Sequence, residues 1–288
     1  MSKDDKNKVN TTGHEWDGIE EYNNPLPRWW VWIFYATIIW GIGYTIAYPA
    51  WPLVKEATPG LLGFSTRANV QSEIERFESM NAEVKAELAS ADLATLADNA
   101  DLYSYAIQSG SATFATFCSQ CHGSGAAGAK GYPNLLDNDW MWGGDIEEIA
   151  YTIRHGIRNE EDYDARYSEM PAFGDDYLSD EEITNVVAYV LSLSGLESEM
   201  GEVSAGEEVY LDNCASCHME DGTGDRMQGA PNLTDAIWLY GSSFAEVEHS
   251  VRVGPFGVMP AWGEEGVGLD DAQIHGVAAY VHQLGGGE

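Results

Sequence analysis

The sequence predicts an all-α protein with one N-terminal transmembrane helix, a helical linker and two tandem copies of a small helical domain. The prediction depends on one uncharged apolar run near the N-terminus, an internal repeat in the C-terminal part and a lack of β-rich stretches in that repeat. The expected parts are an N-terminal segment (1–28), the transmembrane helix (29–48), the linker (49–109), domain 1 (110–200) and domain 2 (201–288).

Residues 29–48 are the candidate membrane anchor. The run contains no charged residue, and as a helix it is about 30 Å long, which matches the hydrocarbon core of a bilayer. Tryptophan and tyrosine occur at both of its ends, as they do at membrane interfaces. The run is too long for a signal peptide, and no small-residue cleavage site follows it. The alternative is a helix buried in a soluble core.

More lysine and arginine residues precede the anchor than follow it. They are Lys3, Lys6, Lys8 and Arg28 before it, and Lys55 and Arg67 in the next twenty residues. The positive-inside rule therefore predicts a cytoplasmic N-terminus, with the rest of the chain on the other side of the membrane.

The linker is expected to be mostly helical. Apolar residues such as Ile74, Phe77, Val84 and Leu88 recur at three- to four-residue steps within residues 66–108. A helix here would hold the C-terminal domains away from the membrane. The alternative is a partly disordered linker.

The C-terminal part contains one module twice. Corresponding stretches are 117–122 and 213–218, 131–135 and 229–233, 170–173 and 259–262, and 187–190 and 278–281. The closing helices are marked by the N-cap pairs Ser179 with Glu182 and Asp270 with Gln273. The first copy has an acidic insertion, roughly residues 159–168.

Each module contains a Cys-x-x-Cys-His sequence, the attachment signature of c-type haem. The motif residues are Cys118, Cys121 and His122 in the first copy and Cys214, Cys217 and His218 in the second. Two thioethers and an iron-ligating histidine are expected at each motif. A zinc site would need further Cys or His ligands, and a thiol redox pair would not repeat with a trailing histidine. The four cysteines all lie in these motifs, so the sequence predicts two covalently bound haem c groups and no disulfide.

Met170 and Met259 are the candidates for the other axial ligand of each iron. They occupy equivalent positions in the repeat, 48 residues after His122 and 41 after His218, and each is followed by Pro-Ala. A thioether ligand favours reduced iron and suits electron relay rather than oxygen binding. Isolated methionines are more often core residues, but the repetition in register favours ligation.

Further residues repeat in register around these positions. Pro133 and Pro231 are candidates to offer a carbonyl to the free ring nitrogen of the haem histidine, or are plain turn residues. Candidates for contact with the haem propionates are Trp140, Trp238, Arg154 and Arg252. Ordinary packing and solvated charge are the alternatives for these four.

The net charge is −33, and much of it lies in the repeat. Residues 110–200 contain 4 Lys/Arg and 17 Asp/Glu, and residues 201–288 contain 2 and 15, so each copy has a net charge of −13. Nucleic acid is excluded as a partner because both copies would repel phosphates. A basic protein partner would be attracted. The alternative is an acidic surface that only maintains solubility, as in a saline habitat.

Residues 110–288 resemble class I cytochrome c domains, with Cys-x-x-Cys-His, then Gly-x-Pro-Asn-Leu, a Met-Pro loop and a closing helix with Ala-Tyr-Val. The N-terminal part adds His-Glu-Trp-Asp-Gly-Ile at 14–19, Asn-Pro-Leu-Pro-Arg-Trp-Trp at 24–30 and Tyr-Pro-Ala-Trp-Pro at 48–52. With these, essentially the whole chain resembles the dihaem subunit III (CcoP or FixP type) of cbb3-type cytochrome c oxidases.

The resemblance implies a bacterial inner-membrane complex that reduces oxygen and pumps protons. In it, this subunit would take electrons from a donor cytochrome c and pass them to a monohaem cytochrome c subunit and on to the haem–copper catalytic subunit. The resemblance also implies the axial pairs His122 with Met170 and His218 with Met259. The rival functions are a free-standing membrane-anchored dihaem shuttle and a dihaem peroxidase, which would need one iron open to peroxide.

Overall fold

The computed structural model describes residues 10–263 and 266–287, and the chain divides into two compact units, Met1–Ser79 and Met80–Glu288. Lys3, Lys6 and Lys8, on which the expected orientation partly depends, lie outside the described residues.

The first unit begins with an antiparallel hairpin of strands β1 (Thr11–Trp16) and β2 (Ile19–Tyr22). Asp17 and Gly18 form the turn with φ of 47° and 86°. An Asp-Gly pair with two positive φ angles is typical of the tight turn that joins two twisted strands. This hairpin was not among the expected elements, although the Asp-Gly dipeptide is its signal. Apart from this hairpin and isolated β-bridges, the regular elements of the described residues are helices, as expected.

Helix α1 (Arg28–Ala47) lies within one residue of the expected anchor at each end. None of its residues is buried, which argues against the alternative of a soluble core helix, and it is long and apolar enough to cross a membrane. The hydroxyls of Thr37 and Thr45 donate to the carbonyls of Phe34 and Ile42 in the preceding turn. A span in lipid must satisfy its polar groups internally in this way.

The end of α1 is capped by the chain that follows it. The amides of Leu61 and Leu62 donate to the carbonyls of Ile46 and Ala47, at 3.0 Å each. Gly60 has a φ of 71°, and a β-carbon there would clash with the last turn of α1. Glycine is needed at this position, and the fold-back satisfies carbonyls that a helix end leaves free.

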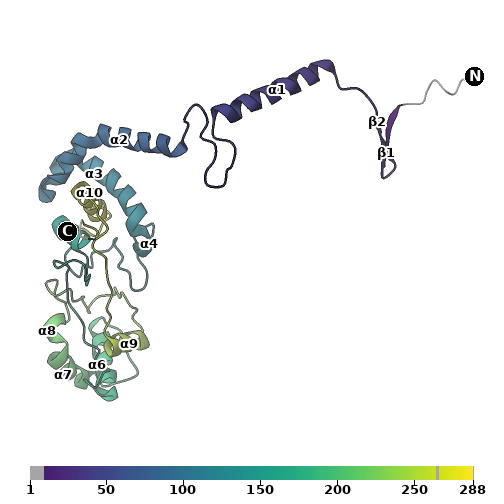
Figure 1. Ribbon diagram of the computed structural model, residues 1–288. Coiled ribbons are helices and arrows are strands. Elements are labelled where there is room, and N and C mark those ends of the chain that lie inside the picture. Colours follow the sequence, from purple (N-terminus) through teal and green to yellow (C-terminus); the bar gives the residue numbers. More distant parts are fainter. Residues whose placement is uncertain (1–9, 264–265, 288) are drawn as a thin grey trace, which may run out of the picture. The chain divides into compact units, whose positions relative to one another are not determined.

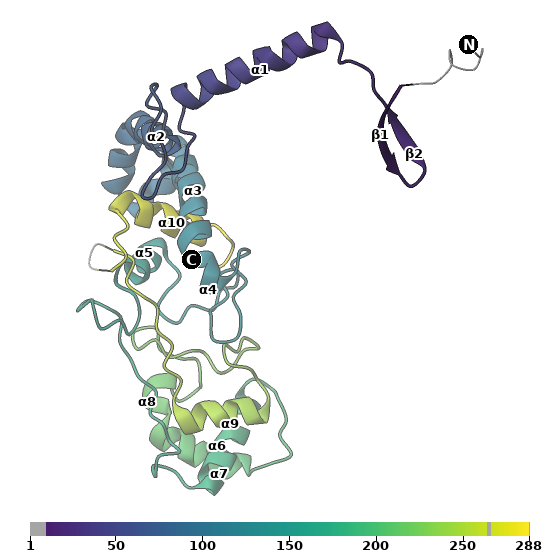
Figure 2. The ribbon, with the colours of Figure 1, turned by 45° about the vertical axis from the view of Figure 1, so that its right-hand side comes forward.

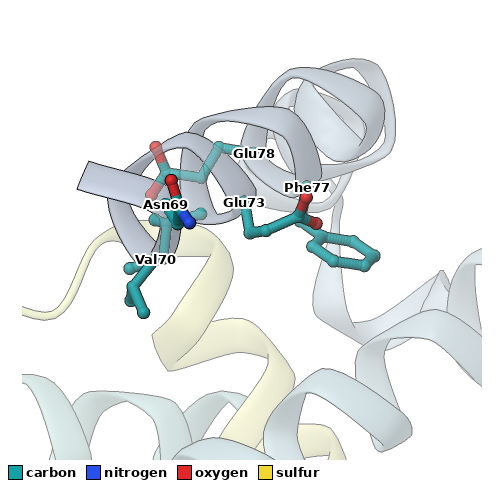
Figure 3. A pocket seen from close by; sticks show the side chains of 6 residues that line it. Asn69, Val70, Glu73, Phe77 and Glu78 are labelled. Atoms are coloured by element: carbon teal, nitrogen blue, oxygen red, sulfur yellow. The ribbon is translucent and has the colours of Figure 1, made fainter. Parts of the chain in front are cut away.

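Helix α2 (Thr66–Ala89) has a shallow apolar depression on its first half. Figure 3 shows Val70 and Phe77 projecting from the helix there, among Asn69, Glu73 and Glu78. The depression contains no histidine or cysteine, so it is unrelated to the haem motifs.

The second unit contains the end of α2 and the helices of both sequence repeats. They are η2 (Leu93–Asp98), α3 (Ala100–Thr113), η3 (Phe114–Cys118), α4 (Ser119–His122), α5 (Ile146–His155), α6 (Asp180–Leu193), α7 (Val203–Asn213), α8 (Ala215–His218), α9 (Phe244–Val253) and α10 (Asp271–His282). The two expected N-caps are confirmed: the Glu182 amide donates to Ser179 Oγ and the Gln273 amide to Asp270 Oδ1.

Two hydrophobic cores form in this unit, and neither consists of a single sequence repeat. In the first core, α3 and α5 pack against α10, which is the last helix of the second repeat. In the second core, α7 and α9 pack against α6, which is the last helix of the first repeat. Figures 1 and 2 show α10 beside α3 and far from α9, which lies with α6 and α7.

The buried residues of the second core lie in one continuous stretch, from Phe173 to Val251. The first core combines two stretches on either side of it, Leu88 to Ile153 and Leu269 to Val281. We expected each repeat to fold as its own domain, with a division near residue 200. That boundary separates the sequence repeats, but the second core is inserted into the first.

The connection between α6 and α7 provides a physical reason. Nine residues join Leu193 to Val203, and such a short connection makes consecutive helices antiparallel neighbours. The crossing is close, because a β-carbon on Gly206 of α7 would clash with the Asn185 carbonyl of α6. Gly110 of α3 makes the same kind of close approach to the Gly276 carbonyl of α10.

Part of the expected linker belongs to the first core. Leu88 and Leu96 are 0% and 2% exposed, and Leu102 of α3 is also buried. The His275 side chain of α10 contacts the Leu88 carbonyl at 2.9 Å. The linker is largely helical, as predicted. From Leu88 onwards, however, it is part of the first core and not only a spacer.

Candidate haem sites

The first Cys-x-x-Cys-His motif occupies the end of η3 and all of α4. His122 Nδ1 lies 3.0 Å from the Pro133 carbonyl oxygen. A carbonyl only accepts, so Nδ1 carries the proton and donates, and the Nε2 lone pair remains available to a metal. The predicted contact between Pro133 and the histidine is therefore present.

The second motif repeats this geometry at the end of α7 and in α8. His218 Nδ1 lies 3.1 Å from the Pro231 carbonyl oxygen. Burial lowers the pKa of His122 and of His218, and it outweighs the carbonyl contacts, which raise it. Both imidazoles are therefore neutral at pH 7, the form that ligates iron.

The cysteines are not arranged for redox catalysis. Burial, with a smaller contribution from the second cysteine of each motif, raises the pKa of Cys118 and of Cys214 to about 11. Catalytic thiol pairs have a lowered pKa instead. Among the described residues, the one group of three side chains that could share a metal ion is His155, Asp162 and Asp164, which contains no cysteine. Neither the thiol pair nor the zinc alternative is supported.

A cavity of about 500 Å³ opens beside the second motif. Cys214, Cys217 and His218 line it, together with Met170 from the first repeat and Trp238. This volume lies in the usual range for sites of cofactors and small molecules. Met170 is thus in the cavity of His218, and not with His122 as the resemblance implied.

Met259 packs against the first core, as do Cys118 of the first motif and its neighbour Phe117. The ring of Trp262, three residues after Met259, contacts Phe117 edge-on with centroids 5.8 Å apart. The structure therefore brings each methionine loop to the motif of the other repeat, unlike the pairing within each repeat that the resemblance implied. The helices of each core come from different repeats, and each methionine loop goes with the helix that follows it.

The two methionine loops contact the opposite helix ends through their backbones. Ile157 and Met259 exchange two hydrogen bonds, of 2.9 and 3.0 Å. Phe173 and Gly174, after Met170, donate to the carbonyls of Val251 and Arg252 at 3.1 and 3.0 Å. The loops therefore have a defined position before any side-chain contact is considered.

The two repeated tryptophans have different environments. Trp140 donates its Nε1 hydrogen to the Gly286 carbonyl, so this hydrogen is already used within the protein. Trp238 Nε1 is buried and has no hydrogen-bond partner among the described residues, although Trp238 lines the cavity. The predicted propionate contact is thus supported by an unused donor only for Trp238.

The two repeated arginines are not in the cavity. Arg154 pairs with Asp271 at 2.7 Å, and Arg252 pairs with Asp180 and Glu248 at 2.8 Å each. Neither lines the cavity of His218. Propionate contact by Arg252 therefore gains no support from this cavity, while contact by Arg154, which lies on α5 in the first core, stays a prediction. Solvated ion pairs, the alternative, describe both.

Arg158 is a cavity residue that the sequence analysis missed. It lies just before the acidic insertion, is partly buried and lines the His218 cavity. Burial lowers the pKa of its guanidinium from its ordinary value, but an arginine remains charged at pH 7. The signal was absent because the second repeat has no arginine at the corresponding position, so the repeat register could not point to it.

These residues fit a haem c group at the second motif. Two free cysteines, a neutral histidine with an available nitrogen, and a methionine meet in one cavity. The unused Trp238 donor and the Arg158 cation suit the carboxylates of such a cofactor. A haem bound there supplies one-electron redox chemistry. Together with the exposed apolar helix α1, the two sites define a membrane-anchored c-type cytochrome.

Comparison with known proteins defines the class further. Residues 8–55 match the family model of the N-terminal domain of cytochrome oxidase-cbb3, FixP, and residues 106–190 and 201–281 match that of cytochrome c oxidase, cbb3-type, subunit III. A cbb3-type cytochrome c oxidase subunit CcoP from Cereibacter sphaeroides is 57% identical over 96% of this chain and 95% of its own length. The same subunit from Rhodobacter capsulatus is 50% identical over 98% of both chains. A FixP subunit from Sinorhizobium medicae is 49% identical over 99% and 97%.

The chain belongs to the family of subunit III of cbb3-type cytochrome c oxidases. It is a haem c-binding electron-transfer subunit that works in a complex with other subunits, and it is anchored in a membrane.

Proposed function

We propose that the chain is the dihaem relay of its oxidase. It takes electrons from a donor cytochrome c in the periplasm and passes them to the monohaem subunit and the haem–copper catalytic subunit, which reduces oxygen in aerobic respiration and pumps protons. The single observation that carries the proposal is the meeting of a histidine, a methionine and two cysteines in the second cavity. At the first motif, Cys118 and Met259 pack against the first core, and His122 contacts the Pro133 carbonyl.

A histidine and a methionine would together hold the haem iron, which would suit relay and leave no position open for peroxide. The dihaem peroxidase is therefore disfavoured. The free-standing shuttle is disfavoured because the relatives are named as oxidase subunits. Deleting the gene should remove oxidase activity from membranes, and the purified chain should carry the other subunits with it. Retained oxygen reduction in the deletion strain would contradict the relay.

We further propose that Met170 ligates the haem attached at Cys214 and Cys217, and that Met259 ligates the haem attached at Cys118 and Cys121. Met170→Ala should lower the reduction potential of the second haem, because a thioether favours reduced iron. Met259→Ala should do so for the first haem.

The near-infrared sulfur-to-iron absorption should fall by about half in each single variant and vanish in the double variant, since each thioether contributes one band. Met200→Ala is the control, because Met200 is exposed and outside both cores. To assign each shift to one haem, the methionine change is combined with Cys-to-Ser changes that prevent attachment of the other haem. A Met170 effect on the first haem would restore the pairing within each repeat.

The orientation is proposed from the flanking cations, with the N-terminus in the cytoplasm and both haem sites in the periplasm. The test uses a chain with an epitope tag added at its N-terminus. Protease added to intact spheroplasts should then cleave in the haem-containing unit and leave this tag protected. Cleavage of the tag in intact spheroplasts would reverse the orientation.

The donor is proposed to be a basic cytochrome c attracted by the acidic insertion. Asp162 does not contribute to this surface, because it is buried and its carboxylate contacts His155 Nδ1 at 2.9 Å. Glu160, Glu161 and Asp164 are exposed. Neutralising these three should flatten the salt dependence of electron entry.

The charge-matched control changes three exposed carboxylates between α6 and α7, at Glu197, Glu199 and Glu202. The rate of donor oxidation measured against ionic strength decides the outcome. Equal slopes for the two triple variants would show that overall charge, and not the insertion, attracts the donor.

A further inference from the structure

Arg158 connects the two methionine loops. Its Nε donates to the Gly257 carbonyl at 2.7 Å and its Nη1 donates to the Ser168 carbonyl at 2.8 Å. Ser168 lies two residues before Met170, and Gly257 lies two residues before Met259. One planar guanidinium therefore holds both loops at matching positions, with a geometry that a lysine ammonium cannot reproduce.

The same side chain brings a positive charge into the His218 cavity. Arg158 lines that cavity, and its guanidinium lies over the Phe256 ring, 5.3 Å from the centroid. Among the described residues it forms no ion pair with a carboxylate, whereas Arg154, Arg166 and Arg252 each do. No direct ion pair therefore neutralises this charge, and the carboxylate that acts on it is that of Glu169, which also lines the cavity.

The first haem site has no equivalent of this residue. When the repeats are aligned at Gly156 and Gly254, the position of Arg158 in the second repeat is occupied by Phe256. The two sites share their histidine, cysteine and carbonyl contacts, so Arg158 is a specific difference between them.

We infer that Arg158 is a positioning residue that secures both methionine loops and raises the reduction potential of the second haem above the value that its axial ligands alone would set. The inference rests on the proposed axial pairing. Ferric haem carries one more positive charge than ferrous haem, so a nearby cation disfavours the oxidised form. The guanidinium also keeps Met170 in place, and a thioether ligand favours reduced iron.

The experiment compares three variants of the full chain in the assembled, haem-loaded oxidase. Arg158→Met removes the charge and both hydrogen bonds. Arg158→Lys keeps the charge but cannot bridge the two carbonyls in the same way. Arg252→Gln is the control, because it removes a charge from the second core without altering the cavity.

Each variant is titrated for the potentials of both haems and heated while the sulfur-to-iron absorption is followed. In Arg158→Met, the potential of the second haem should shift downwards by more than that of the first haem, because only the second loses the nearby charge, and the absorption should be lost at a lower temperature. Arg158→Lys should also lose the absorption at a lower temperature, but the potential of its second haem should stay nearer to that of the unchanged protein. Arg252→Gln should change neither.

Equal potentials in Arg158→Met and Arg252→Gln would overturn the inference, as would equal shifts in Arg158→Met and Arg158→Lys. The Met170→Ala variant separates this failure from failure of the proposed pairing. If Met170→Ala does not alter the second haem, the pairing is wrong. If it does and Arg158→Met has no effect, only the role of Arg158 is wrong.

Discussion

Met219, the residue after the second haem histidine, has a backbone conformation that only glycine adopts without strain. Its φ is 67° and its ψ is 159°. Gly123 takes the equivalent place after His122, with a φ of 79° and a ψ of 154°. The Tyr210 hydroxyl donates to the Met219 carbonyl at 2.8 Å, which helps to hold this conformation. The same turn is thus made by glycine in one repeat and by methionine in the other.

Met219→Gly should stabilise the second core. Such a conformation costs a non-glycine residue about 1–3 kcal/mol of stability. Glycine removes this strain but makes the unfolded chain more flexible, which costs somewhat less than about 1 kcal/mol. The free energy of unfolding should therefore rise by about 1 kcal/mol. Gly123→Ala is the matched reverse change and should destabilise the first core, because nothing lies near its new β-carbon and only the backbone cost remains. Thermal unfolding followed by circular dichroism measures both. A lower melting temperature for Met219→Gly would contradict this account.

At the scale of elements, the ends of α5 and α9 each meet the methionine loop of the other repeat. Gly156 follows α5 with a φ of 74°, and Gly254 follows α9 with a φ of 63°. A β-carbon on Gly156 would clash with the Met259 carbonyl, and one on Gly254 would clash with the Met170 carbonyl. These glycines let each helix end lie directly against a loop that carries a candidate iron ligand.

Gly254→Ala should therefore displace the Met170 loop and weaken the sulfur-to-iron absorption of the second haem. Backbone strain alone should cost about 1–3 kcal/mol, in addition to the clash. Gly125→Ala is the control, because Gly125 has no neighbour near the new β-carbon and no positive φ. Near-infrared absorption and melting temperature are measured on both variants. An unchanged spectrum for Gly254→Ala would mean that the loop can shift without releasing the methionine.

At the scale of the whole molecule, one core is inserted into another. The stretch from Phe173 to Val251 contains the buried residues of the second core, and the chain on both sides of it completes the first. A sequence repeat therefore does not correspond to a folding unit. Each repeat contributes a first helix and a haem motif to one core, and a methionine loop and a closing helix to the other.

The insertion can be tested by shortening the chain. A chain that ends at Met200 lacks α10 and Met259, so its one attached haem should be without a methionine ligand and the sulfur-to-iron absorption should be absent. A fragment of residues 158–256 contains Met170, His218 and all helices of the second core, so it should fold and show that absorption. Folding within each repeat would give the opposite pair of results. Spectra of the two purified haem-loaded fragments decide between them.

The haem-attachment motifs and the features that depend on local geometry could be predicted from the sequence. The haem motifs, the carbonyl contacts of Pro133 and Pro231, the N-caps and the anchor depend on neighbours within a few residues or on composition. The repeat register also identified Met170 and Met259 as a related pair. It could not identify Arg158, which occurs in only one repeat, and the two arginines that it did favour, Arg154 and Arg252, both form ion pairs within the protein.

The sequence by itself determined that this protein has a membrane anchor and two similar haem-attachment modules, because each signal lies in a short stretch of chain. Only the tertiary structure decided which methionine loop lies in which core. The choice depends on the nine-residue connection from α6 to α7, which makes these helices pack together, and on glycines that let the exchanged loops approach. Tandem repeats permit both pairings, because equivalent segments can replace each other, and long-range packing selects between them.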